Sequence, residues 1–336
     1  MSAPSQPPSS GVDEFEAIAR LLRPLAAGAP EALGLADDAA VLSPRPDCDL
    51  VISQDALVEG VHFLSDDALD LVARKLLRVN LSDLAAKGAE PYGYLLAAAW
   101  PPRCGWPERE RFVQGLAADQ ALFGLKLLGG DTTSTPGPLT LAVTILGWTP
   151  QGRMIRRAGA RPGDRVLVSG TIGDGWLGLK AAQGALADVS GEEAAWLAGR
   201  YRLPEPRVEL REPLLEHAVA AADVSDGLIA DAGHLGQAGG VAIALELDRL
   251  PVSEPAQIWL SGQPDQVQTL VELATGGDDY EVVCACAPDH AAELIAACEA
   301  CGVAMTDIGE VRAGEGITVL HQGRPVPVAR TGWRHG

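Results

Sequence analysis

Apolar runs of strand length alternate with helix-like segments along this chain, and the alternation is interrupted once near its middle. The runs "YGYLLAAAW" (Tyr92–Trp100) and "TLAVTILGW" (Thr140–Trp148) predict strands, and the segments 68–87 and 107–124 predict helices. Gly, Pro and Arg cluster in the interruption, "WTPQGRMIRRAGARPGD", after which a new strand is expected from Arg165. The pattern therefore predicts two α/β domains of similar size.

The predicted domains are residues 12–150 and 151–336, which suits a chain of 336 residues. Residues 1–11 are rich in Pro and Ser and lack the basic and apolar regions of a signal peptide, so they are predicted to be a disordered tail. Four further segments have predicted structures. They are an amphipathic helix over 13–27 with Phe15, Ile18, Ala19 and Leu22 on one face, short strands over 40–42 and 50–52, and a helix over 208–221.

The charge of the chain limits the partners it can have. A formal net charge of −19 and a pI near 4.6 argue against binding to nucleic acid. No apolar stretch is long enough to cross a bilayer, so a cytoplasmic location without membrane contact is the default expectation. An anionic small molecule would need metal ions or local arginines to approach such an acidic protein.

Four of the six cysteines are close together in the C-terminal half of the sequence. Cys284 and Cys286 lie on one face of a predicted strand, and Cys298 and Cys301 are one helical turn apart. A zinc site with four thiolates is one interpretation. Burial of reduced cysteines as small apolar side chains is the interpretation we favour.

Aspartates recur beside small residues at the ends of predicted elements. Any one of them alone is explained by a helix cap or a turn. Together they would repel one another unless cations lie between them. The five clusters are Asp37 with Asp38, then Asp55, Asp83, Asp131, and Asp223 with Asp226.

Carboxylate and hydroxyl oxygens favour Mg²⁺ or Mn²⁺ over zinc, and several such ions suit a polyphosphate ligand. The Gly-rich stretch "SGTIGDG" (Ser169–Gly175) lacks the Lys of a P-loop and the spacing of a dinucleotide fingerprint. Neither a G-x-S-x-G elbow nor an H-E-x-x-H helix occurs. A nucleotide would therefore be held through metal ions and backbone amides.

Several motifs, taken in order, resemble the thiamine-monophosphate kinase family, which belongs to the aminoimidazole ribonucleotide synthetase superfamily. The motifs are "ADDAAVL", "SQDALVEGVHF", "VNLSDLAAKGAEP", "LLGGDTT", "RAGARPGD", "DVSDGLIADAGHL" and "GGDDYEV". The resemblance implies a two-domain α/β (α+β) fold with mixed sheets and helices packed on one side. It also implies phosphorylation of thiamine monophosphate by ATP with several Mg²⁺ ions, a homodimer formed through the N-terminal domain, and ATP where the two domains meet.

The resemblance further implies roles for individual residues. The implied magnesium ligands are Asp38, Ser53, Gln54, Asp55, Asp83, Asp131, Asp223 and Asp226. The implied nucleotide contacts are Gly130, Asp131, Arg157 and Ser225. The implied substrate contacts are His62, Asp278 and Trp333, and the implied catalytic residues are Asp131, Arg157 and Asp226. The family commonly has Glu at the position of Asp278.

Two other functions remain open at this stage. One is a different ATP-dependent reaction of the same superfamily, of the aminoimidazole ribonucleotide synthetase type. The other is a nucleotide- or metal-binding regulator without catalysis. The converging carboxylates favour an enzyme, because a protein that only binds would not need so many like charges in one place.

Overall fold

The computed structural model describes residues 12–186 and 189–333. The predicted disordered tail, residues 1–11, lies outside this range. The described chain begins with four short helical segments, α1 (Glu14–Ala17), η1 (Ile18–Leu22), η2 (Arg23–Ala26) and η3 (Pro30–Leu35). The predicted helix over 13–27 thus exists as three successive helical forms, which change to 3₁₀ geometry where Pro24 removes a backbone donor.

The face predicted for this first helical stretch is wrong. Phe15 is 79% exposed, whereas Ala17 and Ala26 are buried. The strand predicted over 40–42 is also absent from the described structure, since these residues are irregular. The buried face of these short helical segments consists of small alanines, which allow close packing. The spacing of the larger apolar residues therefore does not predict which face is buried.

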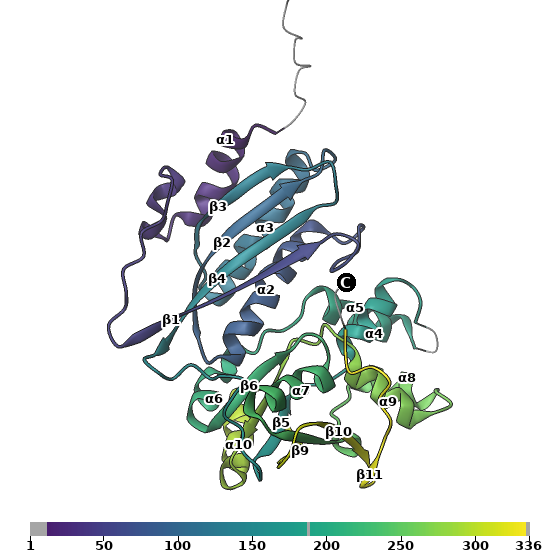
Figure 1. Cartoon of the computed structure of the whole chain (residues 1–336). Helices are drawn as coiled ribbons and strands as arrows, with labels where there is room; N and C mark the ends of the chain where they lie inside the picture. The colour runs from purple at the N-terminus through teal and green to yellow at the C-terminus, as the bar shows by residue number, and fades with distance from the viewer. Residues whose placement is uncertain (1–11, 187–188, 334–336) are drawn as a thin grey trace, which may run out of the picture. The chain divides into compact units, whose positions relative to one another are not determined.

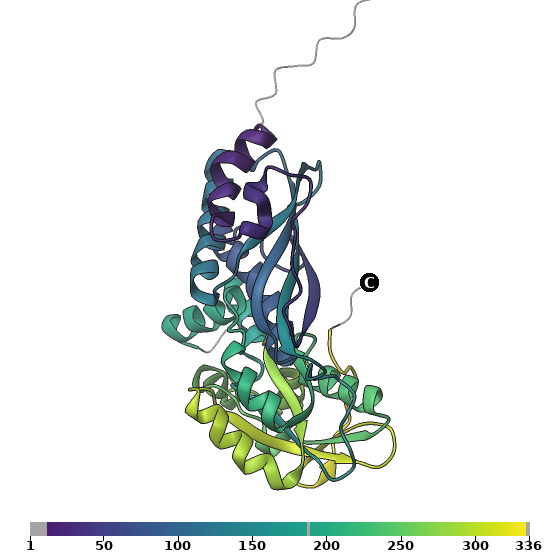
Figure 2. The ribbon, with the colours of Figure 1, turned by 90° about the vertical axis from the view of Figure 1, so that its left-hand side faces the viewer.

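A four-stranded sheet follows, with strand order β1-β4-β2-β3. Its strands are β1 (Cys48–Val58), β2 (Glu90–Trp100), β3 (Leu127–Ser134) and β4 (Thr140–Pro150). The helices α2 (Leu69–Ala86) and α3 (Trp106–Phe123) cover one face of this sheet (Figure 1 and Figure 2). In β4, the buried residues Leu141, Val143 and Ile145 alternate with less buried ones, as expected for a strand with one covered face.

A larger sheet of seven strands has the order β11-β10-β7-β9-β5-β8-β6. The strands are β5 (Arg165–Ser169), β6 (Ala218–Val224), β7 (Ala242–Glu246), β8 (Glu281–Cys286), β9 (Met305–Arg312), β10 (Gly316–His321) and β11 (Arg324–Pro325). It is a mixed sheet, because β7 and β10 are parallel whereas β5 is antiparallel to both β8 and β9. The predicted class of two mixed sheets with helices is confirmed.

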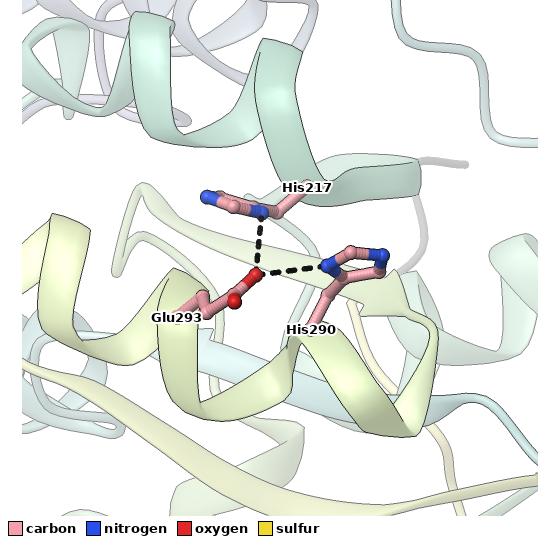
Figure 3. Close-up of side chains that lie close together, drawn as sticks. All are labelled: His217, His290 and Glu293. Carbon is pink, nitrogen blue, oxygen red and sulfur yellow. Dashed lines mark hydrogen bonds and ion pairs between the residues drawn. The ribbon is translucent and has the colours of Figure 1, made fainter.

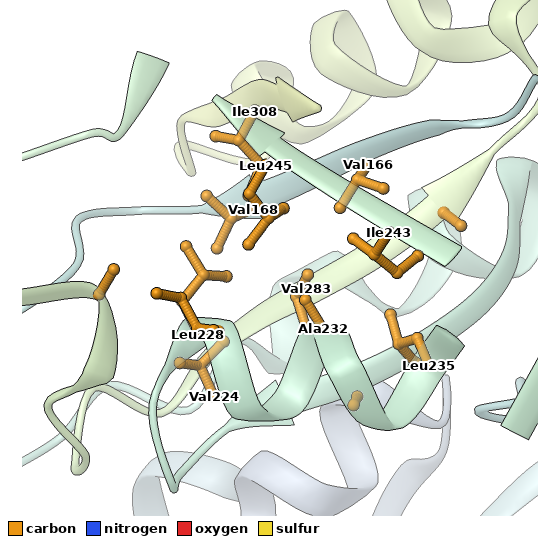
Figure 4. Close-up of a cluster of buried hydrophobic side chains, with 14 of the residues drawn as sticks. Val166, Val168, Val224, Leu228, Ala232, Leu235, Ile243, Leu245, Val283 and Ile308 are labelled. Atoms are coloured by element: carbon orange, nitrogen blue, oxygen red, sulfur yellow. The ribbon is translucent and has the colours of Figure 1, made fainter. Parts of the chain in front are cut away.

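Helices pack on both faces of the seven-stranded sheet, so the predicted packing of helices on one side is wrong for this sheet and holds only for the first one. On one face, α7 (Leu228–Gly239) and α9 (Gln266–Thr275) contribute to the core around Val166 and Val283 (Figure 4). On the other face, α6 (Arg211–His217) and α10 (Ala291–Ala300) share a core with the intervening strand residues. Adjacent residues of a strand point to opposite faces, which is why both faces of β5 and β8 are apolar.

The remaining helical segments are α4 (Asp174–Ala182), α5 (Gly191–Arg202), η4 (Val208–Leu210), η5 (Leu247–Arg249), α8 (Glu254–Ser261) and η6 (Pro288–His290). The helix predicted over 208–221 is therefore wrong in its second half, where "AVAAADV" forms β6. Alanine favours a helix in isolation, but here pairing with β8 along six residues determines the structure.

Three of the four cysteines in the C-terminal half are part of a hydrophobic core. Cys284, Cys286 and Cys298 are fully buried in the core shared by α6 and α10, where burial raises the pKa of their thiols. Cys301 is exposed. The favoured interpretation, reduced cysteines acting as small apolar side chains, agrees with the first three positions and not with Cys301.

Contacts divide the chain into two compact units whose sequences interleave. The first contains the chain up to Pro44, Gln54–Leu77 and Tyr92–Ile145, and the second contains Arg45–Ser53, Arg78–Pro91 and everything from Leu146 on. The elements β1, α2, β2 and β4 therefore contribute residues to both units. Among the described residues, no helix is long and apolar enough to span a membrane.

Candidate active site

Two of the predicted metal ligands, thirty residues apart in sequence, are hydrogen-bonded to each other in the second unit. The Ser53 hydroxyl on β1 donates to a carboxylate oxygen of Asp83 on α2, at 2.5 Å. Both side chains are half-buried. The pair places a hydroxyl and a carboxylate side by side, which is an oxygen donor set that suits a hard cation.

Lys87, which the sequence did not single out, has an ammonium group whose pKa is influenced by the charges of three predicted residues. Its Nζ donates to the carbonyl of Ala221 at 2.6 Å. Burial, and after it the charge of Arg157, lowers the pKa of Lys87 to about 8, although the charges of Asp223 and Asp83 oppose this shift. Three predicted residues from separate segments of the second unit therefore act on the charge of Lys87.

A buried carboxylate on α7 holds the loop that carries two more predicted residues. Asp231 accepts hydrogen bonds from the backbone amides of Ser225, Asp226 and Gly227, at 3.1, 3.1 and 3.2 Å. Burial, assisted by the charge of Asp226, raises the pKa of Asp231 to about 7. The Ser225 and Asp226 side chains thus project from a fixed loop at the start of α7.

The turn that contains Asp278 is anchored by its neighbour, Asp279. The Asp279 carboxylate is buried and accepts from the backbone amides of Gly173 and Gly175 at 2.8 and 2.9 Å. Burial raises its pKa well above the ordinary value. The Gly-rich stretch 169–175 thus supports this turn, and Gly175 is required there because a Cβ would lie 2.2 Å from the carbonyl oxygen of Asp278.

Backbone hydrogen bonds join this turn and the C-terminal segment to the 225–227 loop. The amide of Asp278 donates to the carbonyl of Ser225, and the amide of Trp333 donates to the carbonyl of Asp226, both at 2.9 Å. Asp278 has a φ of 71°, a left-handed conformation that this turn imposes on a residue with a side chain. Asp278 and Trp333, both predicted substrate contacts, therefore lie on segments attached to one loop.

A cavity of about 740 Å³ opens beside this loop along α7. Asp226, His234 and Trp333 are among its lining residues. The Trp333 ring is half-exposed and carries the Arg330 guanidinium 5.4 Å from its centroid. The second unit thus offers an acidic, partly aromatic cavity next to the predicted metal ligands.

The other predicted residues belong to the first unit. Asp38, Gln54, Gly130 and Asp131 are exposed, and Asp55 is half-buried on β1. Gly130 has a φ of 151°, and a Cβ there would lie 1.8 Å from the carbonyl oxygen of Leu96, so only glycine fits.

Asp131 lies within β3, level with Ala97 of the parallel strand β2. The prediction that every carboxylate cluster lies at an element end is therefore wrong for Asp55, Asp83 and Asp131. These residues are inside β1, α2 and β3, at positions where the strand or helix surface is less covered.

His62 also lies in the first unit, in the turn that follows β1. Its Nδ1 accepts a hydrogen bond from the backbone amide of Val58 at 3.0 Å, and its carbonyl accepts from Lys75 Nζ at 3.0 Å. These two hydrogen bonds hold His62 against the end of β1 and against α2.

Comparison with known proteins agrees with this arrangement. Residues 36–149 match the family "AIR synthase related protein, N-terminal domain", and residues 161–322 match the corresponding C-terminal domain. A chain with both domains, an acidic site and no P-loop is thereby placed among AIR synthase related proteins.

Individual proteins that resemble this chain identify its family within the AIR synthase related proteins. A thiamine-monophosphate kinase of Caulobacter vibrioides is 56% identical over 335 residues, which is 100% of this chain and 93% of the relative. The crystal structure of thiamine-monophosphate kinase from Stenotrophomonas maltophilia superimposes with a TM-score of 0.81 at 37% identity, covering 94% of this chain and 98% of that one. A structure described as AaThiL complexed with AMPPCP and TMP gives 0.76 at 30% identity, with 89% and 91% covered. The chain belongs to the thiamine-monophosphate kinase family.

Proposed function

We propose that this protein transfers the γ-phosphoryl group of ATP to the phosphate of thiamine monophosphate, forming thiamine diphosphate and ADP. The observation that carries the proposal is the hydrogen-bonded oxygen pair of Ser53 and Asp83, which lies in the same unit as Arg157 and Asp223. Membership of the kinase family supports the choice of substrates. The reaction requires negatively charged phosphates to be held among carboxylates, which needs cations at the site.

Magnesium ions fit the residues that the chain provides. Ser53, Asp83 and Asp223 offer only oxygen atoms, which Mg²⁺ prefers and zinc does not require. We assign the full set of magnesium ligands to Asp38, Ser53, Gln54, Asp55, Asp83, Asp131, Asp223 and Asp226. Magnesium, when bound, neutralises charge on the donor and acceptor phosphates.

The protein's own groups position the reactants. Arg157 holds donor phosphates with its planar guanidinium, while Gly130 and Ser225 allow backbone and hydroxyl groups to approach the nucleotide. The acceptor is a phosphate that is already ionised at neutral pH, so no strong base is needed, and positioning carries the reaction. Together with Asp131 and Asp226, Arg157 therefore forms the catalytic set.

We assign the acceptor substrate to His62, Asp278 and Trp333. The cavity beside α7 supports the assignment of Trp333, which lines it together with Asp226. Thiamine carries a positively charged thiazolium ring, and an aromatic ring beside carboxylates is a favourable environment for such a cation. The turn held by Asp279 keeps the Asp278 backbone beside that of Ser225.

We also propose a homodimer formed through residues 12–150, and a domain boundary between residues 150 and 151. Exposed apolar side chains on one face of β1, Leu50 at 38% and Ile52 at 58%, support a protein partner for that strand. The unmatched residues between the two family domains support the boundary. Light scattering coupled to gel filtration measures the oligomeric state directly.

ADP release with thiamine monophosphate, measured with and without excess chelator, tests the proposed function. We expect Mg²⁺-dependent turnover that the chelator abolishes. Unphosphorylated thiamine should fail as an acceptor, because an alcohol would need a base beside the donor site. Turnover of formylglycinamidine ribonucleotide instead would assign the chain to the synthetase reaction, and no turnover with any acceptor would favour a binding protein.

A further inference from the structure

Two clusters of potential metal ligands occur among the described residues, and one of them lies away from the candidate active site. Asp226, Asp231 and His234 belong to the loop and cavity already described. His217, His290 and Glu293 form the other cluster, with one ligand atom from each residue within 4.8 Å of the others. We propose that His217, His290 and Glu293 form a binding site for a divalent transition-metal ion, with Zn²⁺ as the best fit.

The geometry of the cluster brings two imidazoles to one carboxylate (Figure 3). Glu293 Oε2 lies 2.9 Å from His290 Nδ1 and 3.9 Å from His217 Nδ1. The two rings are 5.8 Å apart between centroids and tilted by 38°. A His–Glu pair spaced i, i+3 explains His290 alone, but it does not explain a second imidazole that reaches the same oxygen from another helix.

The helices that carry the three side chains are packed on the core of the second unit. His217 ends α6, His290 ends η6 directly before α10, and Glu293 lies in the first turn of α10. α6 buries Leu214 and α10 buries Leu294 in the core that the two helices share on one face of the seven-stranded sheet. The His217 side chain is only 11% exposed, so its ring has little freedom to turn away.

The chemistry of the donors selects the class of metal. Two imidazole nitrogens and one carboxylate oxygen suit Zn²⁺, with Co²⁺ and Ni²⁺ next, and do not suit Mg²⁺, which prefers oxygen alone. His290 and Glu293 are 55% and 63% exposed, which leaves a fourth position open to water. On the far side, His217 Nε2 faces Glu216 Oε2 at 3.9 Å, where a carboxylate can orient a ligating histidine.

The proposed site is separate from the residues assigned to phosphoryl transfer. His217 directly precedes β6, and Asp223 is the sixth residue of that strand. Six residues of extended chain span about 20 Å at ~3.3 Å per residue. A metal at His217 would therefore brace α6 against α10 without touching the reacting phosphates, and this inference does not depend on the kinase activity.

Zn²⁺ binding to the full chain, freed of any affinity tag and saturated with Mg²⁺, tests the proposal by calorimetry. We expect about one Zn²⁺ per chain, as one cluster of this type predicts. Zn²⁺ should also raise the melting temperature, because it binds only the folded state. With Co²⁺ in place of Zn²⁺, we expect visible absorption without a sulfur-to-metal charge-transfer band. The Cys301→Ser substitution should leave the Zn²⁺ stoichiometry and the rise in melting temperature unchanged.

Variants identify the ligands. The double variant His217→Ala/His290→Ala should weaken Zn²⁺ binding by more than about 100-fold, beyond what loss of an outer partner costs. If the double variant folds poorly, the exposed substitution Glu293→Gln tests the same ligand set, and it should also weaken Zn²⁺ binding. His321→Ala is the matched control, because His321 also pairs with a carboxylate, Asp248, but belongs to no cluster with a second histidine among residues 12–186 and 189–333.

The outcomes separate a metal site from a simple ion pair. The site is supported if the cluster variants lose both the Zn²⁺ affinity and the rise in melting temperature. His321→Ala should keep both, and Mg²⁺-ATP turnover should stay unchanged in all variants. Equal Zn²⁺ binding by wild type and by Glu293→Gln, or no Zn²⁺ binding by wild type, overturns it.

Discussion

The Ser53 hydroxyl donates a 2.5 Å hydrogen bond to the Asp83 carboxylate, joining β1 to α2. The two residues were predicted as metal ligands from separate motifs. A hydroxyl that donates to a carboxylate leaves its own lone pairs available to a cation, so the bond also orients the pair for binding a metal. This relationship makes the first prediction possible.

Asp83→Asn should lower Mg²⁺-dependent turnover by orders of magnitude while the metal-free protein remains folded, because it removes a charged ligand and little volume. Ser53→Ala should cost about 10- to 100-fold in metal affinity, as loss of an orienting partner typically does. Steady-state rates titrated with Mg²⁺, together with thermal melts in chelator, measure both effects.

Asp70→Asn is the matched control for this pair of changes. Asp70 lies on the same helix α2 but pairs at the surface with Arg111, at 2.6 Å. Turnover of this variant should stay close to wild type. If Asp83→Asn and Asp70→Asn had the same rate, Asp83 would have no role in binding metal.

Asp131→Asn should reduce turnover by orders of magnitude and leave the metal-free melting temperature unchanged or slightly higher, since repulsion between carboxylates falls. Asp131 lies within β3, paired in register with Ala97, and is exposed. Asparagine preserves this strand position. ADP release and a thermal melt in chelator check the prediction, and a rate within a few-fold of wild type would refute the ligand role.

Three of the residues implied by the resemblance, Asp83, Arg157 and Asp223, come from different motifs, and the charges of all three act on Lys87 in the second unit. Their roles at the site stay a prediction. Lys87 itself was missed, although it follows Asp83 closely in "SDLAAKG". A lysine inside an acidic motif is a sequence signal that can indicate such a residue.

Buried supporting residues were harder to predict, since their role depends on contacts between distant segments. The doublet in "GGDDY" drew attention to Asp278, but Asp279 is the residue that anchors the turn to Gly173 and Gly175. Likewise, β6 resembles a helix in sequence and becomes a strand only through pairing with β8. Local propensity contains no information about either tertiary contact.

The stability of the metal-free protein should depend on pH through Asp231, whose pKa is raised to about 7 by burial. A raised pKa means that the folded state holds the proton more tightly than the unfolded chain. The stability from this group is therefore fully present below about pH 4 and is lost as pH rises through 7. Asp231→Asn removes this dependence.

Between pH 5 and 8, the stability of Asp231→Asn relative to wild type should rise by about 3 kcal/mol, from two pKa units at 1.36 kcal/mol each. Urea unfolding in excess chelator at several pH values measures the difference. The Asn oxygen still accepts from the loop amides, so any constant offset between the variants is not diagnostic. Parallel stability profiles for the two proteins would contradict the assignment.

Glu281 should be the most stability-critical carboxylate of the second unit. Its fully buried side chain accepts from Arg200 at 3.0 Å, from Arg207 Nε at 2.6 Å and from the Ser169 hydroxyl at 2.6 Å. Burial lowers the pKa of Arg207, but its pairing with Glu281 and the charge of Glu205 outweigh this effect and raise the pKa, so Arg207 stays charged. Glu281→Gln leaves both arginines without the buried negative charge, which should cost about 3–5 kcal/mol of folding free energy.

Glu205 provides a matched control, because it contacts the same two arginines from the surface. Its carboxylate lies 3.4 Å from Arg200 and 3.0 Å from Arg207, and its side chain is 58% exposed. Water screens this pair, so Glu205→Gln should cost no more than about 1 kcal/mol. Urea unfolding of the two variants under identical conditions compares the free energies, and equal losses would mean that burial does not determine the strength of this network.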